Sequence, residues 1–232
     1  MPVALPGIIN YMQDCSTFQS EDAGVGVGYL DSELIAHGFL SSWRIMIDRY
    51  PEAGGEVWWW NMALCVKGIY GYRDFRAAGS GKGRLLVRAE SMWFLYDTEK
   101  NMPIRVQPED TLPYGTAGAV SGFGTSTQKD TGAGRLYETG EPIVVARHHI
   151  DTNHHVNNAQ YVDMAREAIP EGLKIREIRA DYKKAAVLGD VGDSAGQRWP
   201  GLGSGQWSLK AIQESSAQWY GLEDRKRTGR EE

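Results

Sequence analysis

The pattern of hydrophobic and polar positions predicts a helix followed by several strands in the first half of the chain. Pro6 precedes apolar residues at helical spacing, and Gly24 suits the C-terminal cap of that helix. Further along, stretches rich in aromatic and β-branched residues are typical of strands. The expected elements are a helix at 5–24, a shorter helical piece at 30–38, a strand at 39–50, one long strand or a bent pair at 57–75 with bulges at Gly68 and Gly71, a turn at 77–83 and a strand at 84–96.

The second half predicts the same order of elements. Gly, Ser and Thr dominate the intervening stretch and no hydrophobic period survives there, which is typical of a linker. Beyond it we expect a strand at 143–149, a helix at about 157–168, strands from 173 onward, a hairpin at 206–220 and a charged, disordered tail. The repeated order suggests an internal duplication in an α+β architecture, in which each antiparallel sheet wraps its own helix.

Composition narrows the classes of protein to consider. Hydrophobic residues make up 41% and charged residues 24%, as in ordinary globular proteins, and the net charge of −5 gives no reason to expect nucleic acid as a partner. Cys15 and Cys65 are too few for a disulfide framework or a zinc site. The start resembles no signal peptide and no apolar run reaches the roughly 18 residues of a membrane span, so we expect a cytoplasmic protein. The run from Trp58 to Trp60 must place at least one ring on each face of a strand, and we expect these rings to pack in the core.

Candidate chemistry gathers in one stretch between the predicted strand and helix of the second half. Four of the five histidines lie there, and Asp151, Asn153 and His155 occupy alternate positions. A strand-to-helix junction offers free helix N–H groups and a positive dipole end, which stabilise a developing negative charge. The stretch is therefore a candidate site for acyl chemistry.

Two simpler interpretations compete with this one. Asp151 and Asn153 are also residue types that cap helices and close turns, but their combination with His155 favours a site. Histidines beside an aspartate can bind zinc or iron, yet neighbours on a strand point to opposite faces, which argues against a metal site. We expect Asn157 and Asn158 to cap the helix and shape the site, and the other histidines to be strand or rim residues.

The run from Asp151 to Asn158, followed by Tyr161, resembles the active-site signature of the acyl-acyl carrier protein thioesterases, the bacterial and plant plastid family with two tandem hotdog folds. The segments at 5–16, 43–50, 70–73 and 181–190 are similar to other parts of the same family. The resemblance implies an N-terminal hotdog domain at 1–106 that shapes the acyl pocket, a linker at 107–140, a catalytic C-terminal hotdog domain at 141–222 and a tail at 223–232.

The resemblance also implies hydrolysis of a fatty acyl chain carried as a thioester on acyl carrier protein, without cofactor or metal. Asp151, Asn153 and His155 match the family's catalytic residues, and Asn157, Asn158 and Tyr161 would support them. With no Ser or Cys nucleophile in this stretch, we favour attack by water over a covalent anhydride on Asp151. Asp151 and His155 both remain candidates for the general base, and the oligomeric state stays open, with a homodimer as one option.

The chain departs from the family in three places. Ala185 and Ala186 stand where the family often has an acidic residue and where plant members then have a cysteine. The family usually has one more strand before Leu5, so the first sheet lacks an edge strand or the start is truncated. The last forty-odd residues match poorly. An acyl-coenzyme A thioesterase and a non-catalytic acyl- or carrier-protein-binding module are therefore alternatives.

Overall fold

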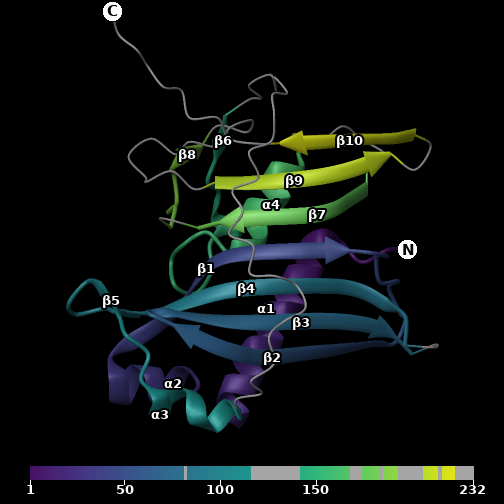
Figure 1. Cartoon of the computed structure of the whole chain (residues 1–232). Coiled ribbons are helices and arrows are strands. Elements are labelled where there is room, and N and C mark those ends of the chain that lie inside the picture. The colour runs from purple at the N-terminus through teal and green to yellow at the C-terminus, as the bar shows by residue number, and fades with distance from the viewer. Residues whose placement is uncertain are drawn as a thin grey trace, which may run out of the picture. The chain divides into compact units, whose positions relative to one another are not determined.

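A computed structural model describes residues 1–80, 83–115, 142–167, 174–182, 185–192, 206–213 and 216–222 (Figure 1). The chain divides into two compact units, Met1–Lys129 and Asp130–Glu232. Each unit combines helices with antiparallel strands, which confirms the predicted α+β class.

The first unit begins with the predicted helix, α1 (Leu5–Asp22), which ends before Gly24 at a φ of 74°. Its buried face carries Ile8, Ile9 and Met12, all without solvent exposure. A second helical piece follows as α2 (Val27–Tyr29) and the π-helical η1 (Leu30–Leu34). This piece ends earlier than predicted, because Ile35 adopts a left-handed conformation that breaks the helix.

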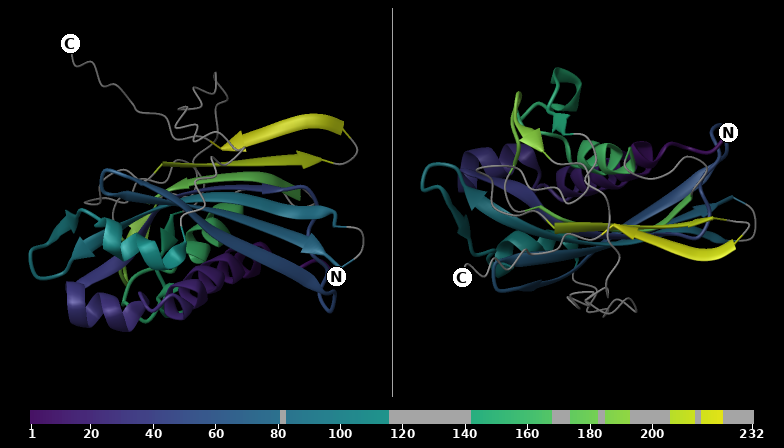
Figure 2. Two further views of the ribbon diagram at one scale, coloured as in Figure 1. Left: turned by 60° about the horizontal axis from the view of Figure 1, so that its bottom comes forward. Right: turned by 90° about the horizontal axis from the view of Figure 1, so that it is seen from above.

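Five strands make up the sheet of the first unit. They are β1 (Ala36–Ile47), β2 (Val57–Lys67), β3 (Tyr70–Gly79), β4 (Leu85–Asp97) and β5 (Met102–Ile104). All neighbours are antiparallel, in the order β2-β3-β4-β1, and β5 pairs with β4. Figure 2 shows α1 lying along one face of this sheet. The core lies between them: Ile45, Ala89 and Phe75 share one cross-strand row and are fully buried.

The predicted segment at 57–75 proves to be two strands. The chain turns at Gly68, where φ is 65°, a conformation that glycine adopts without steric cost. The predicted bulges at Gly68 and Gly71 are wrong, because the register shifts lie between Ala63 and Cys65 and between Ala77 and Ala78. The strand β3 therefore runs into the stretch for which a turn was predicted.

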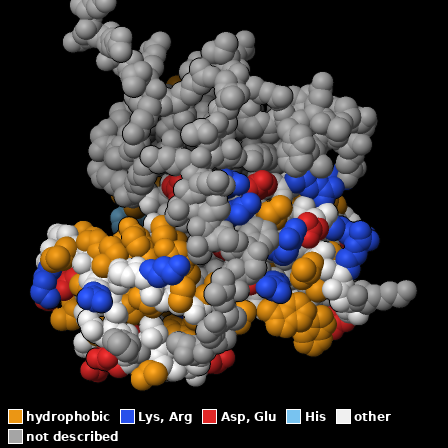
Figure 3. All heavy atoms as spheres, in the orientation of Figure 1, with side chains coloured by type: hydrophobic (Ala, Val, Ile, Leu, Met, Phe, Trp, Pro, Cys, Tyr) orange, Lys and Arg blue, Asp and Glu red, His pale blue; other side chains and the backbone are white. Residues whose placement is uncertain are grey.

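The three consecutive tryptophans do not share one environment. Trp59 is half-buried and stacks on Tyr11 of α1, with ring centroids 5.9 Å apart. Trp58 and Trp60 point to the other face of β2 and are 57% and 53% exposed. Core packing was the wrong prediction for these two rings, because alternation reveals the face but not what covers it. Figure 3 shows hydrophobic side chains exposed on the surface of this unit.

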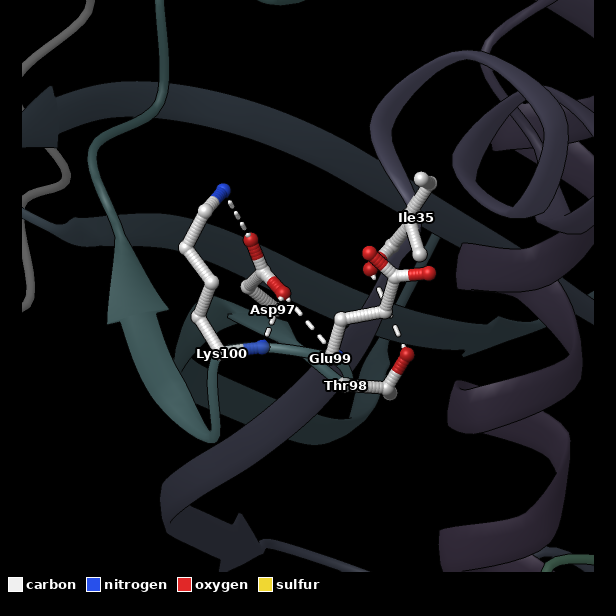
Figure 4. A network of polar contacts seen from close by, with 5 residues as sticks. All are labelled: Ile35, Asp97, Thr98, Glu99 and Lys100. Atoms are coloured by element: carbon white, nitrogen blue, oxygen red, sulfur yellow. Dashed lines mark hydrogen bonds and ion pairs between the residues drawn. The ribbon is translucent and has the colours of Figure 1, made fainter.

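The turn after β4 is held by a compact set of polar contacts (Figure 4). Asp97 accepts hydrogen bonds from the backbone N–H groups of Glu99 and Lys100, at 3.0 and 2.7 Å, and forms an ion pair with the Lys100 ammonium at 2.7 Å. The Thr98 N–H donates to the carbonyl of Ile35 at 3.2 Å. These bonds hold the turn to the start of β1, and the Lys100 hydrogen bonds keep the pKa of Asp97 below its usual value.

The predicted linker is not structureless at its beginning. It contains α3 (Pro108–Thr111) and the 3-10 helix η2 (Leu112–Tyr114). Its remaining residues, from 116 to 140, lie outside the described residues, as does the predicted tail. The domain boundaries at 106 and 140 stay a prediction.

The second unit contains two small antiparallel sheets and one longer helix. The elements are β6 (Ile143–Val144), the 3-10 helix η3 (Arg147–His149), α4 (Asn158–Arg166), β7 (Lys174–Asp181), β8 (Val191–Gly192), β9 (Gln206–Gln213) and β10 (Ser216–Leu222). β9 pairs with both β7 and β10, and β6 pairs with β8. The predicted helix and hairpin are confirmed. The predicted strand at 143–149 is too long, because β6 ends at Val144 and the 3-10 helix η3 begins at Arg147.

Candidate active site

The residues between η3 and α4 form a closed loop. Ile150 and Val156 make an antiparallel bridge, and the Asp151 N–H donates to the carbonyl of His155 at 2.8 Å. One step further out, the Asn157 N–H donates to the carbonyl of His149 at 2.9 Å. Both ends of the loop are thereby fixed to each other, and the sequence-predicted triad lies inside it.

The carboxylate of Asp151 organises the interior of the loop. Its Oδ1 accepts the N–H of Asn153 at 2.8 Å and the N–H of His155 at 3.3 Å. Bonding to main-chain groups a few residues ahead is typical of aspartate in tight turns. The turn also requires His154 to adopt a φ of 62°, a left-handed conformation that is uncommon outside glycine. Asp151 thus joins the three predicted residues through the backbone.

The side chains of the other two triad residues are differently placed. Asn153 is exposed and His155 is half-buried. Within the described part of the chain, neither the Asn153 amide nor the His155 imidazole has a hydrogen-bond partner. Both groups are therefore available to a bound molecule, whereas one oxygen of Asp151 is already engaged.

The helix α4 begins immediately after the loop. Asn157 is its N-cap, and its Oδ1 accepts the N–H of Ala159 at 2.8 Å, the capping role expected from the sequence. Asn158 is the first helical residue, and its carbonyl accepts the hydroxyl of Tyr182 at 3.0 Å. Burial strongly raises the pKa of Tyr182, so this hydroxyl remains a donor. Because α4 begins directly after the loop, the positive end of its dipole lies beside the loop.

One of the positions where the sequence departs from the family, Ala186, lies against this loop. The N–H of Ala186 donates to the hydroxyl of Tyr161 at 2.7 Å, and its carbonyl accepts the N–H of Val156 at 2.9 Å. The Ala186 side chain is fully buried, in a cluster with Val145, Val156 and Met164. Burial raises the pKa of Tyr161, which keeps its hydroxyl protonated. Tyr161 therefore supports the loop by holding the backbone at 186.

One histidine has a role that the sequence did not reveal. His149 was predicted to be a strand or rim residue, but its Nδ1 accepts the N–H of Ala146 at 3.0 Å. His148 and His154 are exposed, as expected for rim residues. Because η3 is a 3-10 helix, His148 and His149 do not point to opposite faces of a strand as expected. Among the residues that the structure describes, no three His, Cys, Asp or Glu side chains are grouped to hold a metal ion. The signal for His149 was its spacing of three residues from Ala146, which fits a 3-10 turn.

Solved structures share the fold over nearly the whole chain. An oleoyl thioesterase from Lactobacillus plantarum superposes with a TM-score of 0.73 at 18% identity, covering 96% of this chain and 88% of that one. A 12:0-ACP thioesterase from Umbellularia californica gives 0.68 at 18% identity, covering 96% and 90%. An acyl-ACP thioesterase from Bacteroides thetaiotaomicron gives 0.72 at 17% identity, covering 93% and 86%. These likenesses establish the fold.

Sequence comparison identifies the family. No curated protein matches the chain at a significant level. In the described part of the chain, no helix has the length and apolar character needed to cross a membrane. Residues 2–114 match the N-terminal domain of the acyl-ACP thioesterases, and residues 137–228 match their C-terminal domain. Since the two matches follow the family's own order and together span most of the sequence, the chain belongs to the acyl-ACP thioesterase family, and it is a thioesterase that hydrolyses fatty acyl-acyl carrier protein.

Proposed function

We propose that this thioesterase releases its fatty acid by direct attack of water, with His155 as the general base, Asn153 as a polar holder of the reacting groups and Asp151 as the anchor of the loop. The observation that carries this division of roles is the bonding of Asp151 Oδ1 to the N–H groups of Asn153 and His155. A carboxylate used in this way fixes the backbone from which the other two side chains project. The imidazole of His155 is then the proton acceptor with no competing bond in the described residues.

The chemistry follows from these roles. His155 removes a proton from water while the water oxygen bonds to the thioester carbonyl carbon. The resulting oxyanion is stabilised by the Asn153 amide as N–H donor and by the positive end of the α4 dipole. When the tetrahedral intermediate collapses, the C–S bond breaks and the imidazolium returns its proton to the leaving sulfur. The products are a free fatty acid and the thiol form of the carrier protein.

Steady-state hydrolysis of a panel of acyl-acyl carrier proteins, run beside matched acyl-coenzyme A esters, tests this proposal. Loss of a general base costs about 10²- to 10⁴-fold and loss of one oxyanion donor about 10²- to 10³-fold, so His155→Ala and Asn153→Ala should lower kcat by these amounts. Added imidazole should partly restore His155→Ala but not Asn153→Ala. Wild-type kcat in either variant, with folding confirmed by circular dichroism, would contradict the assignment.

The partner and its setting complete the proposal. The substrate is a fatty acyl chain on acyl carrier protein, and a preference for carrier protein over coenzyme A in the same panel checks this. A cytoplasmic location and a homodimer remain predictions. Sedimentation of the purified chain at several concentrations measures the second of these directly.

A further inference from the structure

We propose that His149 is a positioning residue for the hydrolysis: its imidazole must be uncharged to hold the catalytic loop in place, so its protonation disables the enzyme independently of His155. The inference rests on the proposed function of the loop. It concerns a residue outside the predicted triad that touches neither substrate nor water in the reaction. It acts through the backbone instead.

His149 makes a reciprocal pair of bonds with Ala146 across η3. The His149 N–H donates to the carbonyl of Ala146 at 3.1 Å, and the Ala146 N–H donates to Nδ1 of His149 at 3.0 Å. The second bond fixes the tautomer of the neutral ring, because a ring nitrogen that accepts a hydrogen bond carries no proton of its own. The proton of the neutral imidazole therefore resides on Nε2.

Ala146 is held by a scaffold on the other side. Its neighbour Val145 is buried and its N–H donates to the carbonyl of Asp190 at 2.8 Å, while the Gly189 N–H donates to the Val145 carbonyl at 3.0 Å. His149 thus connects the fixed segment at Val145 and Ala146 to the loop. Beyond it, the His149 carbonyl accepts the N–H of Asn157, the residue that caps α4.

Protonation reverses the role of the ring at this position. An imidazolium donates from both nitrogens, so Nδ1–H would face the N–H of Ala146 and the bond would be lost. The half-buried Ala146 N–H would then be left without its acceptor, an unfavourable state for a buried donor. The carbonyl of His149 also accepts the N–H of Asn157, so displacement of His149 disturbs the base of the catalytic loop.

Burial and the titratable groups around His149 decide whether its ring is neutral or protonated. Burial lowers the pKa of His149 most, the adjacent His148 lowers it further, and Asp163 of α4 raises it. The rings of His148 and His149 are 4.0 Å apart, and Asp163 is itself paired with Arg166 at 2.9 Å. The net effect is a pKa below the ordinary value, so the ring is neutral at pH 7 and accepts the bond. Only acid conditions protonate the ring.

The test compares the acid limbs of log kcat/KM against pH for wild type, His149→Asn and His148→Asn. Asparagine places an amide oxygen near the position of Nδ1, which accepts the same bond but cannot be protonated in this range. We expect the limiting slope to be steeper by one in the wild type than in His149→Asn, because only the wild type loses activity when the imidazole at position 149 is protonated. The matched control His148→Asn changes the neighbouring ring, which accepts no bond from Ala146, so its slope should equal that of the wild type.

Two further measurements separate this inference from the proposed function. His149→Ala should lower kcat/KM at every pH, and the ¹⁵N shifts of the wild-type imidazole should report protonated Nε2 and bare Nδ1 at pH 7. Equal slopes in wild type and His149→Asn, or a proton on Nδ1, overturn the role of His149 while leaving His155 as the base. Full activity in His155→Ala overturns the proposed function instead, whatever the slopes.

Discussion

The assignment of Asp151 as the anchor of the loop, rather than the base, makes a quantitative prediction for two substitutions. Asp151→Asn keeps an oxygen that can accept the N–H groups of Asn153 and His155, whereas Asp151→Ala removes both bonds. An anchor tolerates the first change and not the second. A general base tolerates neither, because an amide takes up no proton at neutral pH.

The structure sets the size of the expected effects. A hydrogen bond to a charged acceptor contributes about 1.5–3 kcal/mol when fully buried, and less at a half-buried position. Asp151 is half-buried and its bond to His155 is long, at 3.3 Å, so we assign about 2 kcal/mol to the two bonds together. This energy corresponds to a loss of about 30-fold in kcat/KM for Asp151→Ala. Asp151→Asn, which loses only the charge, should remain within about tenfold of wild type.

The assay is kcat/KM for hydrolysis of the preferred acyl-acyl carrier protein, with thermal melts as a check on folding. Asp110→Asn is the matched control, since Asp110 is a half-buried carboxylate of the first unit whose Oδ2 accepts the backbone N–H of Gln107 at 2.8 Å. A fall of about 10³-fold or more in Asp151→Asn, equal to that of Asp151→Ala, would refute the reasoning and identify Asp151 as the base.

Three predictions concern stability. Phe75 is fully buried, so Phe75→Ala should lower the free energy of unfolding by about 3–5 kcal/mol in a denaturant titration, and a smaller loss would mean that the core closes around the gap. Hydrogen bonds from Lys100 hold the pKa of Asp97 below its value in the unfolded chain, which is near 4. The stability that Asp97 contributes is therefore present above about pH 4 and is lost as the pH falls through the lowered pKa. Asp97→Asn should lower the melting temperature at pH 7, and the difference from wild type should disappear in acid. His154→Val should destabilise by about 1–2 kcal/mol because φ is positive there, whereas His154→Gly should not, and equal melting temperatures would exclude backbone strain at this position.

Periodicity predicted those elements whose formation depends on local spacing. The buried face of α1 consists of Ile8, Ile9 and Met12, which the sequence spaces at helical intervals. The spacing of hydrophobic residues likewise predicted α4 and the β9–β10 hairpin. Periodicity failed where a hydrogen bond between a side chain and the backbone favours a turn over an extended strand. The apolar run after Pro142 predicts a strand through His149, but the bonds between His149 and Ala146 close a 3-10 turn instead. Such a bond carries no hydrophobic period.

The structure brings the predicted site residues into one loop, with an internal bonding that the sequence did not reveal. The sequence placed Asp151, Asn153 and His155 at alternate positions between a predicted strand and a predicted helix. The structure instead bends the chain at His154 and joins the three through backbone N–H groups. Sequence patterns report which side chains are present, whereas the main-chain bonds that arrange them depend on φ and ψ. The roles of the three residues could be divided only once those bonds were known.

The two alanines that replace an acidic residue and a cysteine bear on the mechanism. Ala186 holds the loop entirely through its main chain, by its bonds to Tyr161 and Val156, and any residue type except proline would supply these. Its side chain fills a closed apolar cluster, so it contributes packing and no chemistry. Neither cysteine of the chain lies in the second unit, so the loop and the unit that contains it carry no thiol. The absence of a thiol from the loop favours the proposed attack by water, activated by His155, over a cysteine nucleophile within the loop.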